Sequence, residues 1–212
     1  MVSATEALNR LKTGNRDFIT VRRHERDLSP ERVEELYTYG QNPFAVVLTC
    51  SDSRTVPEHM FMMGLGDLFV VRVAGNVVGP AELASIVYAC EHLRTKLVLV
   101  LGHTGCGAIE AAMQALDGAQ LQGCGRNDGE NGAAGGNEGE HALDALVRPI
   151  GTAIGAERDP YGACELNVRA GMRALGESPS LKRLLNPEDG EEPLMIAGAI
   201  YHTHSGTVDF LK

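Results

Sequence analysis

Phe44-Ala-Val-Val-Leu-Thr49 and Leu97-Val-Leu-Val-Leu-Gly102 are two apolar runs, and each ends directly before a short polar sequence. The first run is followed by Cys50-Ser-Asp-Ser-Arg54, and the second by His103-Thr-Gly-Cys-Gly107. Neither run alternates apolar with polar residues, which is typical of strands that are buried on both faces of a parallel sheet. Because the carboxyl ends of parallel strands meet at one edge of such a sheet, we expect the two polar sequences to lie together.

The sequence around these two runs predicts an α/β fold. Helical patterns separate the strand-like runs, which indicates a mostly parallel central sheet flanked by helices. A last pair of strand-like runs, joined by a short turn, predicts an antiparallel terminal strand that ends the sheet. The further elements expected are a strand over 67–73, helices over 80–94, from Gly105, over about 141–154 and over 160–176, and strands over 194–201 and 207–211.

Two segments depart from this alternation. Apolar residues at helical spacing over 4–20, and a Ser29-Pro30 helix start, predict an N-terminal helical arm over residues 1–40 that lies on the surface ahead of the core. Residues 117–140 are rich in Gly, Asn and Glu and carry no apolar periodicity, which predicts a Gly-rich loop insertion. A chain of 212 residues is long enough for one domain, so we expect a single domain over 1–212.

Composition limits the classes of partner and compartment. A net charge of -9 argues against binding to nucleic acid or to an anionic membrane, so the expected partners are small molecules and copies of the chain itself. Residues 1–20 mix charged with single apolar residues, unlike a signal peptide or a membrane span, and we therefore expect a cytoplasmic protein. Five cysteines in a chain of this size predict thiols that bind metal or pack in the core, and no structural disulfide.

The two polar sequences offer two thiols and one imidazole, from Cys50, His103 and Cys106. Three soft or borderline ligands, with no fourth Cys or His beside them, suit a Zn²⁺ ion that keeps one position for water or for a labile carboxylate. Cys106 follows His103 by three residues in a Gly-flanked turn that leads into a helix, so both side chains can converge on one ion. The helix N-terminus also favours the thiolate form of Cys106.

Further motifs accompany this pattern along most of the chain. They are, in order, Gly40-Gln-Asn-Pro43, Pro57-Glu58, Gly66-Asp-Leu-Phe-Val-Val-Arg72, Ala74-Gly-Asn76, Glu165-Leu-Asn-Val168, Gly198-Ala-Ile-Tyr201 and Ser205-Gly-Thr-Val208. Together with the two polar sequences, this series resembles the β-class carbonic anhydrases. The resemblance implies a zinc enzyme, a carbonate dehydratase of the lyase class, in which zinc-bound hydroxide reversibly hydrates carbon dioxide to bicarbonate and a proton. It implies Cys50, His103 and Cys106 as the metal ligands.

Asp52 and Arg54 fit the same chemistry. A carboxylate two residues from a ligand can accept a hydrogen bond from zinc-bound water, or it can displace that water as the fourth ligand. The rigid donor fork of Arg54 can hold Asp52 away from the metal. In the family such a dyad controls the fourth zinc position. Val47 stands where allosteric members of the family carry Trp, which favours water rather than Asp52 on the metal.

The resemblance also implies a substrate pocket. Gln41 matches the position from which plant-like members hydrogen-bond the substrate oxygen, and Phe69, Ala74 and Tyr88 match positions that line the pocket. In the family the N-terminal helices embrace a neighbouring chain, and Gln41 reaches the partner's zinc. The resemblance therefore implies N-terminal helices that serve dimerisation, and a homodimer or homotetramer.

Two other functions stay open. A hydrolase of carbonyl sulfide or carbon disulfide would use the same ligands on the same scaffold, and a non-catalytic zinc-binding regulatory protein would keep the metal without turnover. His202 and His204, two residues apart, could form a second metal site, relay protons or lie on a solvated turn. Cys90 and Cys164 fall in helical patterns and are expected to pack in the core.

Overall fold

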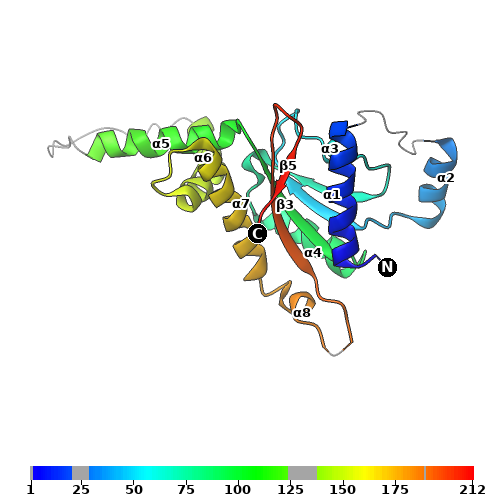
Figure 1. Cartoon of the computed structure of the whole chain (residues 1–212). Helices are drawn as coiled ribbons and strands as arrows, with labels where there is room; N and C mark the ends of the chain where they lie inside the picture. The colour runs from blue at the N-terminus through cyan, green and yellow to red at the C-terminus, as the bar shows by residue number, and fades with distance from the viewer. Residues whose placement is uncertain (1, 21–28, 124–137, 189) are drawn as a thin grey trace.

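The computed structural model describes residues 2–20, 29–123, 138–188 and 190–212 (Figure 1). Its centre is a five-stranded sheet in the order β2-β1-β3-β4-β5. The first four strands pair in parallel, and β5 pairs antiparallel with β4. The mostly parallel sheet with an antiparallel terminal strand is therefore confirmed. The strands are β1 Ala45–Thr49, β2 Leu68–Arg72, β3 Leu97–His103, β4 Met195–Tyr201 and β5 Val208–Phe210.

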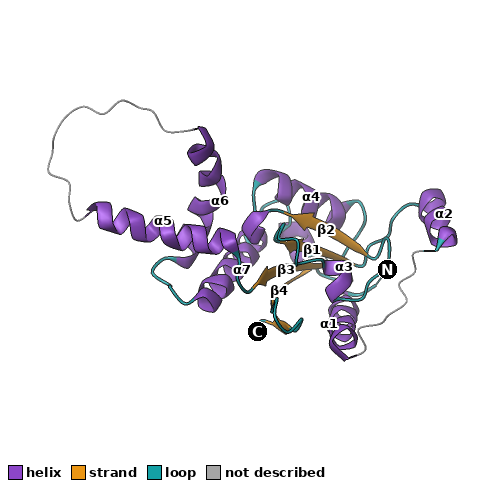
Figure 2. Cartoon of the chain, turned by 90° about the horizontal axis from the view of Figure 1, so that it is seen from above, coloured by secondary structure: helices purple, strands orange, loops and turns teal. Residues whose placement is uncertain are grey.

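Helices cover both faces of this sheet, as the view from above shows (Figure 2). One face packs against α4, α5, α6 and α7, and the opposite face packs against α1 and α3. None of the helices within the described ranges has the length and apolar character needed to cross a membrane. The helices are α1 Ala4–Thr20, α2 Pro30–Tyr39, α3 Pro57–Met60, the 3-10 turn η1 Ala74–Asn76, α4 Pro80–Glu91, α5 Gly107–Gly123, α6 Glu138–Ile154, α7 Pro160–Gly176 and α8 Lys182–Leu185.

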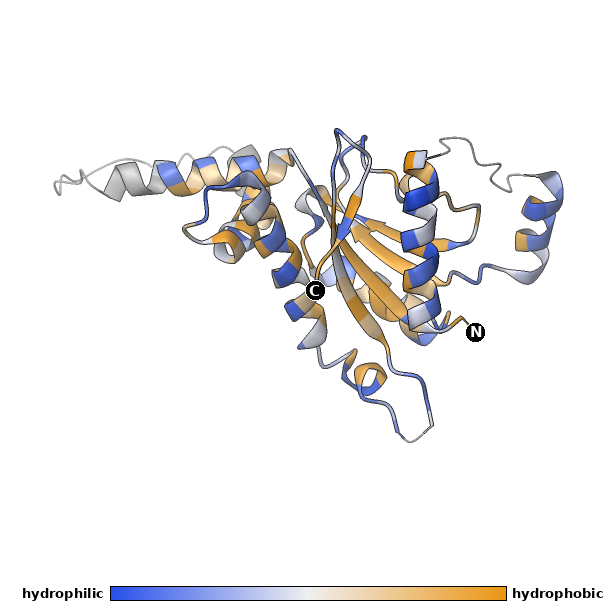
Figure 3. Ribbon diagram, in the orientation of Figure 1, coloured by the Kyte–Doolittle hydropathy of each residue, from blue (hydrophilic) through white to orange (hydrophobic). Residues whose placement is uncertain are grey.

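The central strands are apolar on both faces because both faces are covered. Every residue of β1 and β3 is buried, and the strands form the apolar centre of the molecule (Figure 3). Alternate residues of each strand point to opposite faces of the sheet. Leu48 and Val98 pack against the helices α4 to α7, whereas Val47 and Leu99 pack against α1. This arrangement explains why the two runs show no alternation of apolar and polar residues.

Helix α1 differs from the surface arm that we expected. Its Ala7 and Leu11 are fully buried against the sheet. The buried Asn15 donates from Nδ2 to the carbonyl oxygens of Met60 (3.1 Å) and Gly206 (2.9 Å), and its Oδ1 accepts from the Val208 amide (2.9 Å). A side-chain amide that is satisfied by two distant segments fixes α1 in the core, so the expectation was wrong for this helix.

Helix α2 agrees with the surface expectation. It buries no residue, and Tyr37 and Tyr39 are each 85% exposed, with Val33 53% exposed. The helix begins at a Ser29 cap that accepts from the Arg32 amide, followed by Pro30 in the first turn. The sequence therefore specifies a stable helix start, while Val33, Tyr37 and Tyr39 of the helix remain in solvent.

The predicted loop over 117–140 is wrong at both ends. Helix α5 continues to Gly123 and α6 begins at Glu138, and the two helices pack together and extend away from the sheet (Figures 1 and 2). The Asp117 carboxylate pairs with Arg158 at 2.8 Å, and Leu116 lies against Gly151. These tertiary contacts, together with good helix formers such as Ala and Gln, extend the helix beyond the apolar periodicity. The rest of the predicted insertion, 124–137, lies outside the described residues.

A substitution at Gly14 tests how α1 docks. A Cβ at this position would overlap the backbone carbonyl of Phe61, so Gly14→Ala forces α1 away from the sheet. We expect a loss of about 1–3 kcal/mol in the free energy of unfolding, measured by chemical denaturation.

Gly118→Ala is the matched control, because Gly118 lies in α5 with open space around the position of a Cβ. This variant should gain up to about 1 kcal/mol from helix propensity. Equal stability of the two variants would contradict the close packing of α1.

Candidate active site

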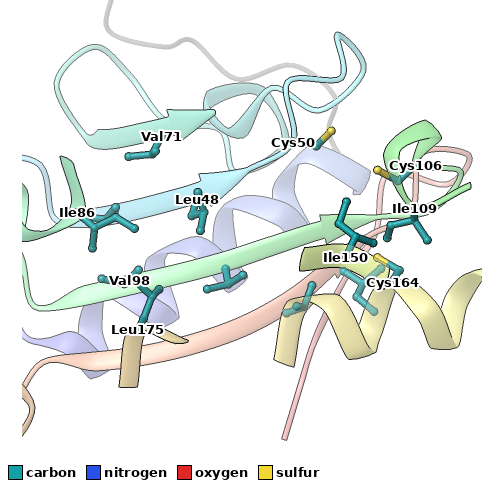
Figure 4. Close-up of a cluster of buried hydrophobic side chains, with 14 of the residues drawn as sticks. Leu48, Cys50, Val71, Ile86, Val98, Cys106, Ile109, Ile150, Cys164 and Leu175 are labelled. Atoms are coloured by element: carbon teal, nitrogen blue, oxygen red, sulfur yellow. The ribbon is translucent and has the colours of Figure 1, made fainter. Parts of the chain in front are cut away.

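The candidate site lies where the strand order changes direction. The chain passes from β1 to its neighbour β2 on one side, whereas β3 pairs with β1 on the other side. In open parallel sheets such a switch point forms a crevice at the carboxyl ends of the strands. Cys50 directly follows β1, His103 is the last residue of β3, and Cys106 directly precedes α5. Figure 4 shows the sulfur atoms of both cysteines at this edge.

The ligand atoms of Cys50, His103 and Cys106 all lie within 4.8 Å of one another. All three residues are buried, with 5%, 1% and 4% of their surface exposed. The convergence predicted from the strand ends is therefore present. The four described cysteines, these two and the buried Cys90 and Cys164, are free thiols, and Cys124 lies outside the described residues.

His103 presents a lone pair to the two sulfur atoms. Its Nδ1 lies 3.0 Å from the Thr104 carbonyl oxygen, which can only accept, so Nδ1 carries the proton. Nε2 is then an acceptor, and it is buried without a hydrogen-bond partner in the described part of the chain. A buried nitrogen in this condition is costly unless it binds another group. The orphaned Nε2 beside two thiols therefore fits a metal ion.

The two thiols differ in their surroundings. The Cys50 sulfur accepts hydrogen bonds from the backbone amides of Asp52 (3.4 Å) and Gly75 (3.3 Å). The Cys106 thiol donates to Cys50, and chiefly for this reason the pKa of Cys50 is lowered to about 4. The same contact raises the pKa of Cys106. Cys50 is thus built to hold a thiolate, which is the form that binds soft divalent metals.

Asp52 and Arg54 lie at the open side of this donor set. Arg54 donates from Nε to Asp52 Oδ1 (3.0 Å) and from Nη2 to Oδ2 (2.7 Å), and its amide also donates to Oδ1 (2.9 Å). The Arg54 hydrogen bonds hold the pKa of Asp52 well below its usual range. Asp52 Oδ2 stands 3.9 Å from His103 Nε2, so an ionised carboxylate borders the donor set without entering it.

The Arg54 guanidinium also connects the two polar sequences. Its Nη2 donates to the Gly105 carbonyl oxygen at 2.9 Å, in the turn between His103 and Cys106. Gly105 has φ +65°, a conformation that glycine adopts without strain and that the tight turn requires. One side chain therefore positions Asp52 and braces the turn that carries the other two ligands.

Two further residues shape the site, and the sequence analysis gave neither a role. The buried Thr55 hydroxyl lies within hydrogen-bond distance of the carbonyl oxygens of Cys50 (3.1 Å) and Asp52 (2.8 Å). Arg72, at the end of β2, donates to the same two oxygens at 3.3 and 2.8 Å. Both residues therefore hold the loop that begins at Cys50 in place through hydrogen bonds to its backbone carbonyl groups. A charged residue that ends an apolar strand was the available sequence signal for Arg72.

The predicted pocket residues divide into two groups. Ala74 precedes Gly75, whose amide contacts the Cys50 sulfur, so it lies beside the donor set. Phe69 and Tyr88 pack against each other with ring centroids 6.2 Å apart. Phe69 pairs with Val46, four residues before Cys50, which corresponds to about 13 Å along β1.

Gln41 precedes β1, whereas Cys50 follows it. The five residues of β1 alone span about 16 Å, so the structure does not bring Gln41 to the candidate metal ligands of its own chain.

Comparison with known proteins agrees with this geometry. The model of the family described as Carbonic anhydrase matches residues 45–208. A carbonic anhydrase of Pseudomonas aeruginosa is 33% identical over 204 residues, which cover 89% of this chain and 83% of that protein. A carbonic anhydrase of Mycolicibacterium smegmatis is 47% identical over 107 residues, or 50% of this chain and 52% of that protein. The chain thus spans about half the length of the mycobacterial relatives that it matches.

Solved structures of carbonic anhydrases share the fold of this chain. A β-carbonic anhydrase from the filamentous ascomycete Sordaria macrospora, described as tetrameric, superimposes with a TM-score of 0.65 at 25% identity, over 86% of this chain and 87% of that one. The β-carbonic anhydrase CcaA shares the fold, with a TM-score of 0.65 at 24% identity over 96% of this chain and 98% of that one. The chain belongs to the β-carbonic anhydrase family.

A substitution at Cys106 tests the donor set. The purified protein should bind about one zinc per chain, and Cys106→Ser should lose most of it, because a hydroxyl is a far poorer ligand for a soft metal than a thiolate. Metal content measured by plasma mass spectrometry checks this expectation.

Cys90→Ser is the matched control. Burial raises the pKa of the Cys90 thiol to about 12, and Cys90 lies outside the cluster of ligands. The control variant should keep its metal. Full zinc content in Cys106→Ser would reject the assigned donor set.

Proposed function

We propose that this protein is a zinc-dependent carbonic anhydrase that reversibly hydrates carbon dioxide to bicarbonate and a proton. The observation that carries the proposal is the buried set of two sulfur atoms and one unpartnered imidazole nitrogen, bordered by a carboxylate that an arginine holds in place. Membership of the β-carbonic anhydrase family supports the same reaction.

The donor set favours zinc among the common divalent ions. Two thiolates and one imidazole are typical zinc ligands, and a set of only three leaves a coordination position open. A zinc ion bound here would lower the pKa of water and so supply a nucleophile. Because two thiolates cancel the charge of the ion, this effect is weaker than with three neutral imidazoles, and activity should rise toward mildly alkaline pH.

Asp52 has the positioning role in this proposal. As an ionised carboxylate it can only accept hydrogen bonds; Oδ1 accepts two from Arg54, whereas Oδ2 accepts one and keeps a lone pair free. It can therefore accept a hydrogen bond from the attacking water and direct the oxygen lone pair of that water at the carbon of the substrate. Arg54 keeps the carboxylate in this orientation and prevents it from becoming a ligand itself.

The substrate pocket is proposed to form between two chains. Ala74 serves the site of its own chain, whereas Gln41, with Phe69 and Tyr88, serves the site of a partner. The exposed tyrosines of α2 support an association of this kind, because large apolar surfaces exposed on a single chain are commonly covered in an assembly. We propose a homodimer as the minimum active unit, with a homotetramer as a pair of such dimers.

Stopped-flow hydration of carbon dioxide by the zinc-loaded protein tests the function, and two variants test the dyad. Asp52→Asn should keep its zinc and lose about 10–100-fold in rate, because the amide misdirects the attacking water. Arg54→Ala should lose a similar factor for a different reason, since Asp52 becomes free to enter the donor set. X-ray absorption at the zinc edge should report a carboxylate oxygen in the Ala variant alone.

An inactive zinc-loaded parent would reject the proposed reaction. A parent rate retained by both variants would instead assign the dyad a purely structural role.

Co-expression of two defective chains tests the shared pocket. Gln41→Ala keeps its ligands and Cys106→Ser keeps its Gln41, so a mixed dimer has one complete site, made by the ligands of the first chain and Gln41 of the second. Each variant alone should be strongly impaired, and the purified mixed dimer should regain up to about half the parent rate. A mixed dimer no faster than Gln41→Ala alone would place the role of Gln41 within its own chain.

A further inference from the structure

We propose that Thr203 is a positioning residue that fixes the orientation and the tautomer of the candidate metal ligand His103. Thr203 lies in the turn that joins β4 to β5, and His103 ends the paired strand β3 (Figure 1). The two residues are far apart along the chain but meet at one edge of the sheet. The inference rests on the proposed zinc site, and it does not depend on which reaction the zinc supports.

The connection between the two residues runs through Thr104. The Thr104 carbonyl oxygen accepts from His103 Nδ1 at 3.0 Å and from the Thr203 hydroxyl at 3.2 Å. The Thr104 hydroxyl oxygen in turn accepts from the Thr203 amide at 3.1 Å, and the two hydroxyl oxygens lie 3.1 Å apart. Thr203 therefore holds both the side chain of Thr104 and the carbonyl group that contacts the His103 ring.

These contacts fit one arrangement of the hydrogen atoms. A carbonyl oxygen can only accept, so the Thr203 hydroxyl donates to it. The hydrogen between the two hydroxyl oxygens then comes from Thr104. In this arrangement every N–H and O–H of the cluster has an acceptor, and the His103 ring donates from Nδ1. The series of hydrogen bonds thus leaves the Nε2 lone pair of His103 for a metal ion.

The carbonyl group that contacts the ring needs such support, because it belongs to the peptide group between Thr104 and Gly105. Gly105 has φ +65°, and glycine adopts either sign of φ without strain. This peptide group can therefore turn over at little cost, as in the change between type II and type I turns. The Gly105 N–H would then face His103 Nδ1 and donate to it. Nε2 would carry the proton instead, and it could not bind a metal ion.

Thr203 can oppose this change because its own turn is fixed. The His202 amide donates to the Thr207 carbonyl oxygen at 2.8 Å, and the Gly206 amide donates to the His202 carbonyl oxygen at 2.8 Å. The buried Asn15 side chain of α1 donates to the Gly206 carbonyl oxygen at 2.9 Å. A side chain on a well-held turn positions its partner more precisely than one on a mobile loop. The β4–β5 turn therefore supports the metal ligand of a different strand.

Removal of the Thr203 hydroxyl tests the role. Thr203→Val keeps a similar shape and should bind zinc about tenfold more weakly in competition with a chromogenic chelator, because the ion must first select the correct tautomer. Thr203→Ser keeps the hydroxyl and should bind zinc as the parent does. In the zinc-free protein, ¹⁵N NMR of the imidazole nitrogens should show only the Nδ1–H tautomer of His103 in the parent. The same spectrum of Thr203→Val should show both tautomers.

Ser205→Ala is the matched control. The Ser205 hydroxyl lies in the same turn, 2.7 Å from the Thr207 hydroxyl, and makes no hydrogen bond with residues 103–106 in the part of the chain that the structure describes. This variant should keep the parent affinity, and circular dichroism checks the fold of each variant. Parent-like zinc affinity in Thr203→Val, or an equal loss in Thr203→Ser, would overturn the role of the hydroxyl. A parent that binds no zinc would reject the proposed function, and this role with it.

Discussion

The parallel pairing of β1 with β3 is the constraint on which the rest of the molecule depends. It brings two sequence segments more than fifty residues apart to one sheet edge, with Thr49 beside Leu101 at the last register position. Cys50 directly follows Thr49, and His103 lies two residues beyond Leu101, so two of the candidate metal ligands come next along these strands. Helix packing on both faces maintains this register, because a slip by one residue would move every apolar side chain of β1 to the wrong cluster. Stability and metal binding thus rest on the same backbone hydrogen bonds.

A second layer of contacts converts this edge into a defined site. Thr55 and Arg72 hold the backbone carbonyl groups of the Cys50 loop, and Arg54 joins that loop to the turn between the other two ligands. Arg54 contributes charge as well as geometry, because its guanidinium pairs with the Asp52 carboxylate at the edge of the two thiols. Desolvation of these acidic groups would otherwise raise the cost of ionising them. The site can therefore hold the Cys50 thiolate and the Asp52 carboxylate close together, while Cys106 keeps its proton.

Sequence patterns predicted most of the architecture for a physical reason. Buried strands and strongly periodic helices depend on local apolar spacing, which is visible along the chain, and the three metal ligands follow from residue type at strand ends. The docking of α1 was not predicted, because it depends on Gly14 and on the distant partners of Asn15. The extension of α5 was not predicted, because it is stabilised by tertiary contacts rather than by apolar periodicity. These contacts are the ion pair between Asp117 and Arg158 and the packing against α6. Thr55 and Arg72 act through backbone oxygens of the Cys50 loop; the sequence offered a signal only for Arg72, as a charged residue at the end of an apolar strand.

The position of Gln41 and Cys50 at opposite ends of β1 has a consequence for how the protein behaves when it is dilute. A strand is a rigid spacer, so the two ends of one chain cannot fold back to complete a single site. Activity that needs both ends must then follow the association equilibrium, and specific activity falls as the protein concentration drops below the dissociation constant of the pair. In the proposed dimer, the abundance of the chain would set its specific activity. Its specific activity would be low at concentrations where the monomer dominates and would reach its maximum where the dimer dominates.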